Sequence, residues 1–171
     1  MVATATKQDG EAYVNLLPRI IQTIENLGYK PYFLIHEGRV DRNFTEEINQ
    51  KLITRLPIVQ EDNPLHIKGI ISKSKAVITS RFHGLVSCLS QAIPCLATSW
   101  SHKYETLLQD YNYPEGMLDV YCDDELLIAK VKSVLTEPSR NLIIEKLKNE
   151  SVKQKKRSEE MWEKVFKKIE E

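Results

Sequence analysis

The chain has 171 residues, of which 42% are hydrophobic, and this is enough apolar material for the core of one ordinary domain. Lys and Arg together number 24, as do Asp and Glu, so a formal net charge of zero argues against nucleic acid or an anionic membrane as a partner. No apolar run approaches the ~20 residues of a membrane span, and the N-terminus lacks the pattern of a signal peptide.

The cysteines and the absence of familiar motifs narrow the cofactor classes. Cys88, Cys95 and Cys122 show no C-x-x-C pairing, and two of them lie in apolar segments, so we expect buried, reduced thiols in a cytoplasmic protein. The sequence has no G-x-G-x-x-G, no Walker loop and no metal-ligand spacing. We therefore expect neither a bound dinucleotide nor a metal, and no cofactor.

The first two thirds of the chain alternate short β-like runs with helical ones. Val2 to Thr6 is a candidate strand, and a loop with Asp9-Gly10 leads to a helix from about Glu11 to Leu27, which Gly28 ends. The apolar run 31–36 is typical of a strand buried on both faces of a parallel sheet. The further expected strands are 57–60, 76–79 and 94–98, and the further expected helices are 41–54, 64–74, 83–92 and 102–111.

This alternation predicts an α/β fold, a three-layer Rossmann-like parallel sheet with helices on both faces. After Asp119 the pattern changes to an amphipathic helix over 123–135 and a long or broken C-terminal helix over 139–171. We thus predict a Rossmann-like domain over 1–135 and a helical extension over 136–171. The basic residues of the polar gap in the last helix are expected on a solvated face, namely Lys153, Lys155, Lys156 and Arg157.

The stretch Ser80-Arg81-Phe82-His83-Gly84 joins an expected strand end to a helix start, where parallel α/β sheets bind ligands. Unpaired first-turn N–H groups and the helix dipole favour an anion there. The planar guanidinium of Arg81 suits a phosphate or a carboxylate. His83 could donate a proton near neutral pH, and Gly84 lets a ligand approach the backbone closely. The structural alternative is an Arg packed on a helix C-terminus and a His that caps its own helix.

Two further loops are expected at the same edge. In Ser99-Trp100-Ser101-His102-Lys103, Ser101 with Glu105 fits an N-cap, whereas Lys103 is an unusual choice for a helix N-terminus unless an anion binds nearby. Trp100 offers a stacking surface for a sugar. His36, which closes the strand 31–36, is either another site residue or an ordinary hydrogen-bonding side chain.

The run from Ile70 to Leu108 resembles the polysaccharide pyruvyl transferases. It contains S-R-F-H at a strand end, S-Q-A-I-P at a helix end and then W-S-H-K-Y, in the order in which that family carries them. The strand ending in Ile35-His36-Glu37 looks like the family's shorter histidine-bearing strand, and the resemblance spans roughly residues 1 to 135. It implies the C-terminal, donor-binding half of a GT-B-like enzyme, with the acceptor-binding N-terminal domain missing from this chain.

The resemblance also implies a reaction. Such enzymes are transferases that move the pyruvyl group of phosphoenolpyruvate onto two hydroxyls of a sugar, forming a ketal on a cell-surface or cell-wall glycan or a lipid-linked sugar. By resemblance, Arg81 and His83 contact the donor, His83 is the candidate acid and the Phe82 backbone helps to bind the anion, while Gly84, Ser101, Lys103 and His36 complete the predicted substrate site. Turnover by this chain alone is not expected.

Two alternatives remain open at this point. The first is the nucleotide-sugar-binding half of a GT-B glycosyltransferase, for which Glu61 and Asp62 are the nearest ribose-binding candidates. The second is a non-catalytic interaction module, or an oligomer, that uses the apolar stripe around Met161, Trp162, Val165 and Phe166. We expect the protein in the cytoplasm, either free or at the inner face of the membrane.

Overall fold

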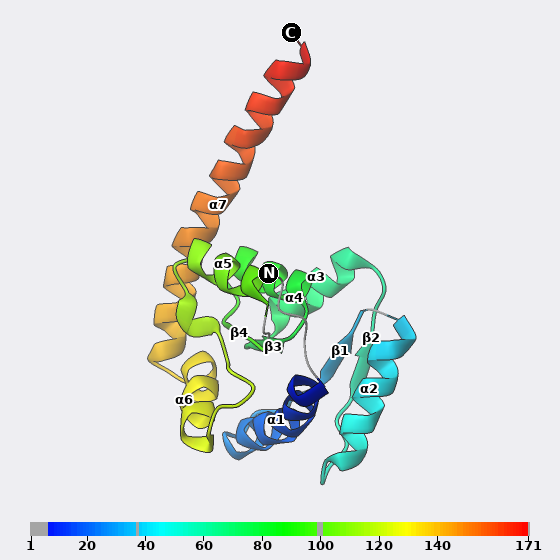
Figure 1. The fold of residues 1–171 in the computed structure, drawn as a ribbon. Helices are drawn as coiled ribbons and strands as arrows, with labels where there is room; N and C mark the ends of the chain where they lie inside the picture. Colours follow the sequence, from blue (N-terminus) through cyan, green and yellow to red (C-terminus); the bar gives the residue numbers. More distant parts are fainter. Residues whose placement is uncertain (1–6, 37, 99–100, 171) are drawn as a thin grey trace.

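The computed structural model describes residues 7–36, 38–98 and 101–170 (Figure 1). The predicted strand Val2 to Thr6 lies outside these residues. The helices are α1 (Lys7–Asn26), α2 (Gly38–Lys51), α3 (Pro64–Lys73), α4 (Phe82–Ser90), α5 (His102–Asp110), the short η1 (Pro114–Gly116), α6 (Asp124–Leu135) and α7 (Ser139–Glu170). The strands are β1 (Phe33–Ile35), β2 (Ile58–Gln60), β3 (Val77–Thr79) and β4 (Cys95–Ala97).

The order of helices and strands confirms the predicted alternation from residue 11 onward, with small shifts at the ends. The prediction of a loop around Asp9-Gly10 was wrong, because α1 begins at Lys7. A glycine inside a helix costs only about 1 kcal/mol, which the apolar face of this helix outweighs through Leu16, Ile20 and Ile21, all buried. Gly28, at a φ of 81°, confirms the predicted stop, and the N–H of Tyr29 closes the helix end on the carbonyl of Ile24 at 3.2 Å.

The described strands form two separate parallel pairs. β1 pairs with β2, Phe33 opposite Ile58, and β3 pairs with β4, Val77 opposite Cys95. The fold is therefore mixed α/β and mostly helical, and the described strands do not form the single three-layer sheet that we predicted. Pro57 and Pro94 precede β2 and β4; they have no N–H to donate, but their carbonyls accept the N–H groups of Phe33 at 2.9 Å and of Val77 at 3.0 Å.

The core lies around α4 and β4. All three residues of β4 are buried, whereas β1 buries only Ile35 and β3 is half-exposed, so only β4 has the two-sided burial expected of the strand 31–36. The three cysteines are buried and free, as predicted. A hydrogen bond with Cys88, together with complete burial, raises the pKa of the Cys95 thiol.

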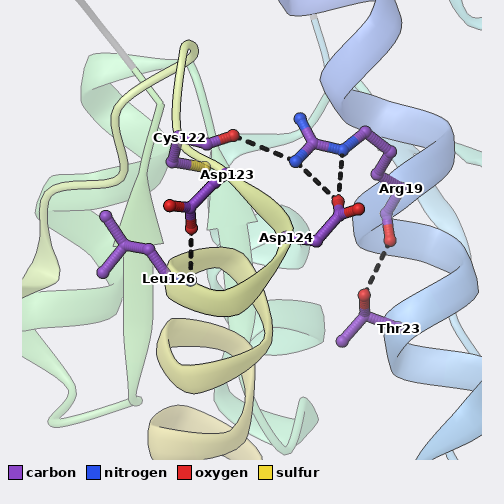
Figure 2. Close-up of polar contacts among 6 residues, drawn as sticks. All are labelled: Arg19, Thr23, Cys122, Asp123, Asp124 and Leu126. Atoms are coloured by element: carbon purple, nitrogen blue, oxygen red, sulfur yellow. Dashed lines mark hydrogen bonds and ion pairs between the residues drawn. The ribbon is translucent and has the colours of Figure 1, made fainter.

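Helix α6 is tied to α1 by the side chain of Arg19 (Figure 2). The guanidinium of Arg19 donates to Asp124 Oδ1 through Nε at 2.9 Å and to the carbonyl of Cys122 through Nη2 at 2.9 Å. Asp123 caps the same helix, since its carboxylate accepts the N–H of Leu126 at 2.8 Å. The two hydrogen bonds of Arg19 fix the start of α6 against α1, and the cap at Asp123 stabilises the first turn of α6.

Helix α7 is one continuous helix whose two halves differ in their surroundings. Ile143, Leu147 and Ser151 are buried, and this half packs against α4 and α6. The basic residues of the polar stretch, Lys153, Lys155, Lys156 and Arg157, are exposed, which confirms their predicted solvated face. From residue 158 to residue 170 every position is exposed, and this end extends away from the body of the protein (Figure 1).

Within the described ranges, none of the helices is both long enough and apolar enough to cross a membrane.

Candidate functional site

The connection from β3 to α4 is held by Thr79. Its Oγ1 accepts the N–H of Arg81 at 3.0 Å, and Arg81 takes the N-cap position of α4 with an extended backbone. A guanidinium offers only donors, and no side-chain capping bond is made at this position. The positive end of the α4 dipole therefore coincides with a positively charged side chain, an arrangement that favours an anion.

The side chain of Arg81 connects this loop to α2. Its Nη2 pairs with Oδ1 of Asp41, in the first turn of α2, which follows β1. The Arg81 side chain remains 44% exposed and that of Asp41 20% exposed. The ion pair brings the regions beyond the carboxyl ends of the two strand pairs to one place, as expected for parallel strands.

Ser80 is held by two tyrosines, one that precedes it and one that follows it in the sequence. The hydroxyl of Tyr104, in α5, donates to the Ser80 carbonyl at 2.6 Å, and the hydroxyl of Tyr13, in α1, donates to Ser80 Oγ at 3.0 Å. The Tyr13 ring is parallel to that of Phe44 in α2, with the two centroids 5.8 Å apart. Helices α1, α2 and α5 thus hold Ser80, which joins the end of β3 to Arg81 and the start of α4.

Lys103 is brought to the start of α4 by aromatic contacts. Its Nζ lies 5.0 Å from the ring centroid of Phe82 and 5.5 Å from that of Tyr104, within the range of cation–π attraction. The Phe82 and Tyr104 rings meet edge to face at 5.5 Å, and the His83 ring lies 6.1 Å from Phe82. Lys103 and His83 are both exposed. Arg81, Phe82, His83 and Lys103 therefore form one cluster, called here the α4 entrance.

The remaining predicted site residues are placed less centrally. Ser101 takes the N-cap position of α5, with Glu105 in the first turn, in agreement with the structural interpretation of both. His36 is half-buried after β1, and no hydrogen bond or ion pair within the described ranges joins it to the α4 entrance. Trp100 lies outside the described residues.

Gly84 has a packing role that the sequence did not indicate. It is buried, and a Cβ at this position would lie 2.8 Å from Oγ1 of Thr79. The missing side chain thus makes room for the hydroxyl that holds the N–H of Arg81, rather than for open space beside the helix. Asp41, Tyr13 and Tyr104 are further contributors that sequence reasoning missed, although Tyr104 is part of the W-S-H-K-Y motif.

Glu61, one of the two ribose-binding candidates, is engaged elsewhere. Its carboxylate accepts the N–H of Asn63 and that of Asp62, both at 2.9 Å, and pairs with His66 Nδ1 at 3.1 Å. These bonds, that of Asn63 first, lower the pKa of Glu61 and commit the group to the turn that starts α3. The alternative of a nucleotide-sugar site thereby loses one of its two nearest acidic candidates, Glu61 and Asp62.

Comparison with known families decides which class of protein carries this entrance. The family model described as polysaccharide pyruvyl transferase matches residues 1–102. The chain belongs to the polysaccharide pyruvyl transferase family. The match spans well over half of the chain, ends short of the predicted limit at residue 135, and stops one residue before Lys103. No curated protein and no solved structure matches the chain.

Membership in the polysaccharide pyruvyl transferase family, a family of transferases, gives the α4 entrance a chemical context. The matched residues include all four strands, the Asp41–Arg81 pair and the start of α4. The long helix α7 lies outside the match.

Proposed function

We propose that this chain binds phosphoenolpyruvate at the α4 entrance and acts as the donor-binding part of a polysaccharide pyruvyl transferase. The observation that carries the proposal is the gathering of Arg81 and Lys103 at the N-terminus of α4, beside the exposed His83. Two cationic side chains and a helix N-terminus suit a small ligand with a phosphate and a carboxylate.

Asp41 is proposed to orient the arginine rather than to oppose the ligand. A guanidinium carries five N–H donors in a planar fork, and Asp41 contacts it through Nη2. Fixing the plane of the fork reduces the side-chain entropy that binding would otherwise cost. Lys103, held over two rings, supplies a more mobile point charge to the same anion.

His83 is proposed to be the general acid. In the first half of the reaction, a sugar hydroxyl forms a bond to C2 of the donor while C3 takes a proton from His83 and becomes a methyl group, and the proton of the attacking hydroxyl returns to His83. In the second half, the C2–O bond to phosphate breaks, a second hydroxyl of the sugar bonds to C2 and closes the ketal, and the proton of that hydroxyl leaves with the phosphate. The α4 amide groups and Arg81 stabilise the departing phosphate.

The finer parts of the predicted architecture belong to the same proposal. The parallel direction of both strand pairs and the Asp41–Arg81 contact beyond their carboxyl ends support a Rossmann-like arrangement of the GT-B kind, built on two strand pairs, with the domain boundary near residue 135. A second domain would then bind the acceptor, a glycan or lipid-linked sugar, and the reaction would take place in the cytoplasm.

Calorimetric titration with phosphoenolpyruvate tests the proposal. Arg81→Ala is expected to weaken binding at least tenfold, Arg81→Lys less, and Lys132→Ala, an exposed cation on α6, not at all. His83→Ala should retain binding of the donor.

Because Arg81→Ala also leaves Asp41 unpaired, the double variant Arg81→Ala/Asp41→Asn separates contact from repulsion. Binding stays weak in the double variant if Arg81 touches the donor, and its recovery would refute the role of Arg81. Tighter binding of UDP or CMP than of phosphoenolpyruvate would refute the proposed donor.

A further inference from the structure

The exposed end of α7, which extends away from the rest of the protein, carries an apolar stripe. The stripe consists of Met161, Trp162, Val165, Phe166 and Ile169, which are all exposed. Trp162 and Phe166 stack on each other with centroids 5.9 Å apart, and they line a shallow hollow together with Glu159 and Glu163. Large apolar side chains gathered at helical spacing on one exposed segment indicate an interaction surface.

The stripe lies on a part of α7 that is exposed along its whole length. The last contacts of α7 with the body that the described residues show are those of Gln154, which donates to the carbonyl of Asp110 at 2.5 Å, and of Arg157 with the carboxylate of Asp110 at 3.9 Å. Beyond them follow 13 exposed residues, 158 to 170. Most of the stability of helices in proteins comes from tertiary packing of an amphipathic face, so packing against a second helix would stabilise this end of α7.

The charges of this segment identify the partner. The first half of the segment carries Glu159, Glu160 and Glu163, and the second half carries three lysines and one acidic residue: Lys164, Lys167, Lys168 and Glu170. A parallel copy would set acid against acid and base against base. An antiparallel copy sets the acidic half of each helix beside the basic half of the other, and it also opposes the two helix dipoles.

We propose that two copies of this chain associate through an antiparallel pairing of α7 residues 158 to 170. The twofold axis passes between Glu163 and Lys164, so that Trp162 faces Val165 of the second copy. The same patch serves both copies, as a twofold interface requires. The proposal does not depend on the donor site, because none of the residues of the α4 entrance takes part.

An anionic bilayer fits the segment less well than a second copy. Residues 158 to 170 contain four acidic and three basic side chains, whereas surface-bound amphipathic helices carry Lys and Arg on their polar face. The acidic half would repel the same headgroups that the basic half attracts.

Sedimentation velocity of the full chain, from micromolar to hundreds of micromolar, tests the association. We expect a dimer that dissociates on dilution, and a rise of at least tenfold in the dissociation constant for Trp162→Glu, with an unchanged circular dichroism spectrum. The control Val152→Glu changes an apolar residue of α7 that is also exposed, 65%, but lies outside the stripe, and should leave the constant unchanged. A wild-type chain that stays monomeric throughout overturns the proposal.

Orientation is tested with single cysteines. In the proposed register Ser158 faces Ile169 of the second copy, so an oxidised mixture of Ser158→Cys and Ile169→Cys should form mainly the mixed disulfide. The native cysteines are buried and do not compete. A preference for disulfides between identical variants overturns the antiparallel arrangement. Monomeric protein that sediments with phosphatidylglycerol vesicles through Trp162 overturns the choice of partner.

Discussion

The packing of Gly84 against Thr79 predicts the effect of one added methyl group. In an exposed helix interior, Gly→Ala stabilises a protein by up to about 1 kcal/mol. At position 84 the new Cβ would lie 2.8 Å from Thr79 Oγ1, while Cβ and Cγ2 of Thr79 stay at the ordinary distances of 3.6 and 3.7 Å. The threonine must therefore rotate its hydroxyl away from the N–H of Arg81.

The magnitude follows from what that rotation removes. A lost hydrogen bond costs about 1 kcal/mol, and overpacking in a buried site costs about 1–3 kcal/mol, against a helix-propensity gain of up to about 1 kcal/mol. We expect Gly84→Ala to destabilise the protein by about 1–3 kcal/mol. The N-cap of α4 loses its support at the same time, so the affinity for phosphoenolpyruvate should fall as well.

Urea unfolding followed by circular dichroism measures the first effect, with two comparisons. Gly69→Ala on α3, where a Cβ meets nothing within 4 Å, should stabilise the protein. Thr79→Ala removes the atom in conflict, so in a double-mutant cycle Gly84→Ala should cost at least about 1 kcal/mol less on the Thr79→Ala background. A Gly84→Ala variant as stable as Gly69→Ala would refute the reasoning.

Three other predictions concern stability. Asp123→Ala should lower the free energy of unfolding by about 1 kcal/mol through loss of the α6 cap, whereas Asp124→Asn should change it by less than about 0.5 kcal/mol because that carboxylate is 78% exposed; equal costs in urea titrations would contradict this ranking. Gly116→Ala should cost about 2–3 kcal/mol, since its Cβ would overlap the ring of buried Tyr113, whose hydroxyl donates to the Cys95 carbonyl at 3.0 Å; a thermal melt like that of the wild type would argue against this contact. The raised pKa of Cys95 means that the folded state keeps a proton that the unfolded state releases above the ordinary value of 9.0, so stability should fall as pH rises past about 9, by at most about 1.4 kcal/mol per pH unit; Cys95→Ala should show a smaller slope between pH 9 and 10, and an identical slope would exclude this thiol as the cause.

Local patterns in the sequence predicted most of the helices and strands, because those patterns report interactions between near neighbours. The 3.6-residue spacing of apolar residues located α1, and Gly28 marked its end through a backbone angle that other residues rarely adopt. Ser80 to Gly84 was correctly placed between a strand and a helix, and the order of motifs over residues 70 to 108 indicated the family that the comparison shows.

The contacts that build the α4 entrance were beyond such patterns. Asp41 lies 40 positions from Arg81, Tyr13 lies 67 from Ser80, and Tyr104 lies 24 from Ser80. Each of these side chains has an ordinary local role, in the first turn of a helix or on an apolar face. The residues next to it in the sequence do not indicate which distant residue it contacts. The split of the described strands into two pairs was equally invisible, since each apolar run predicts a strand but not which edge it pairs with.

Sequence alone determined the order of elements, the family and the residue types at the start of α4, because these depend on neighbours along the chain. Only the tertiary structure showed that Asp41 pairs with Arg81 and that Lys103 lies over the ring of Phe82 beside it. It also showed that a side chain at Gly84 would collide with the hydroxyl of Thr79. Those arrangements arise when the core forms and brings distant helices to one edge, so they follow from packing and not from any single segment.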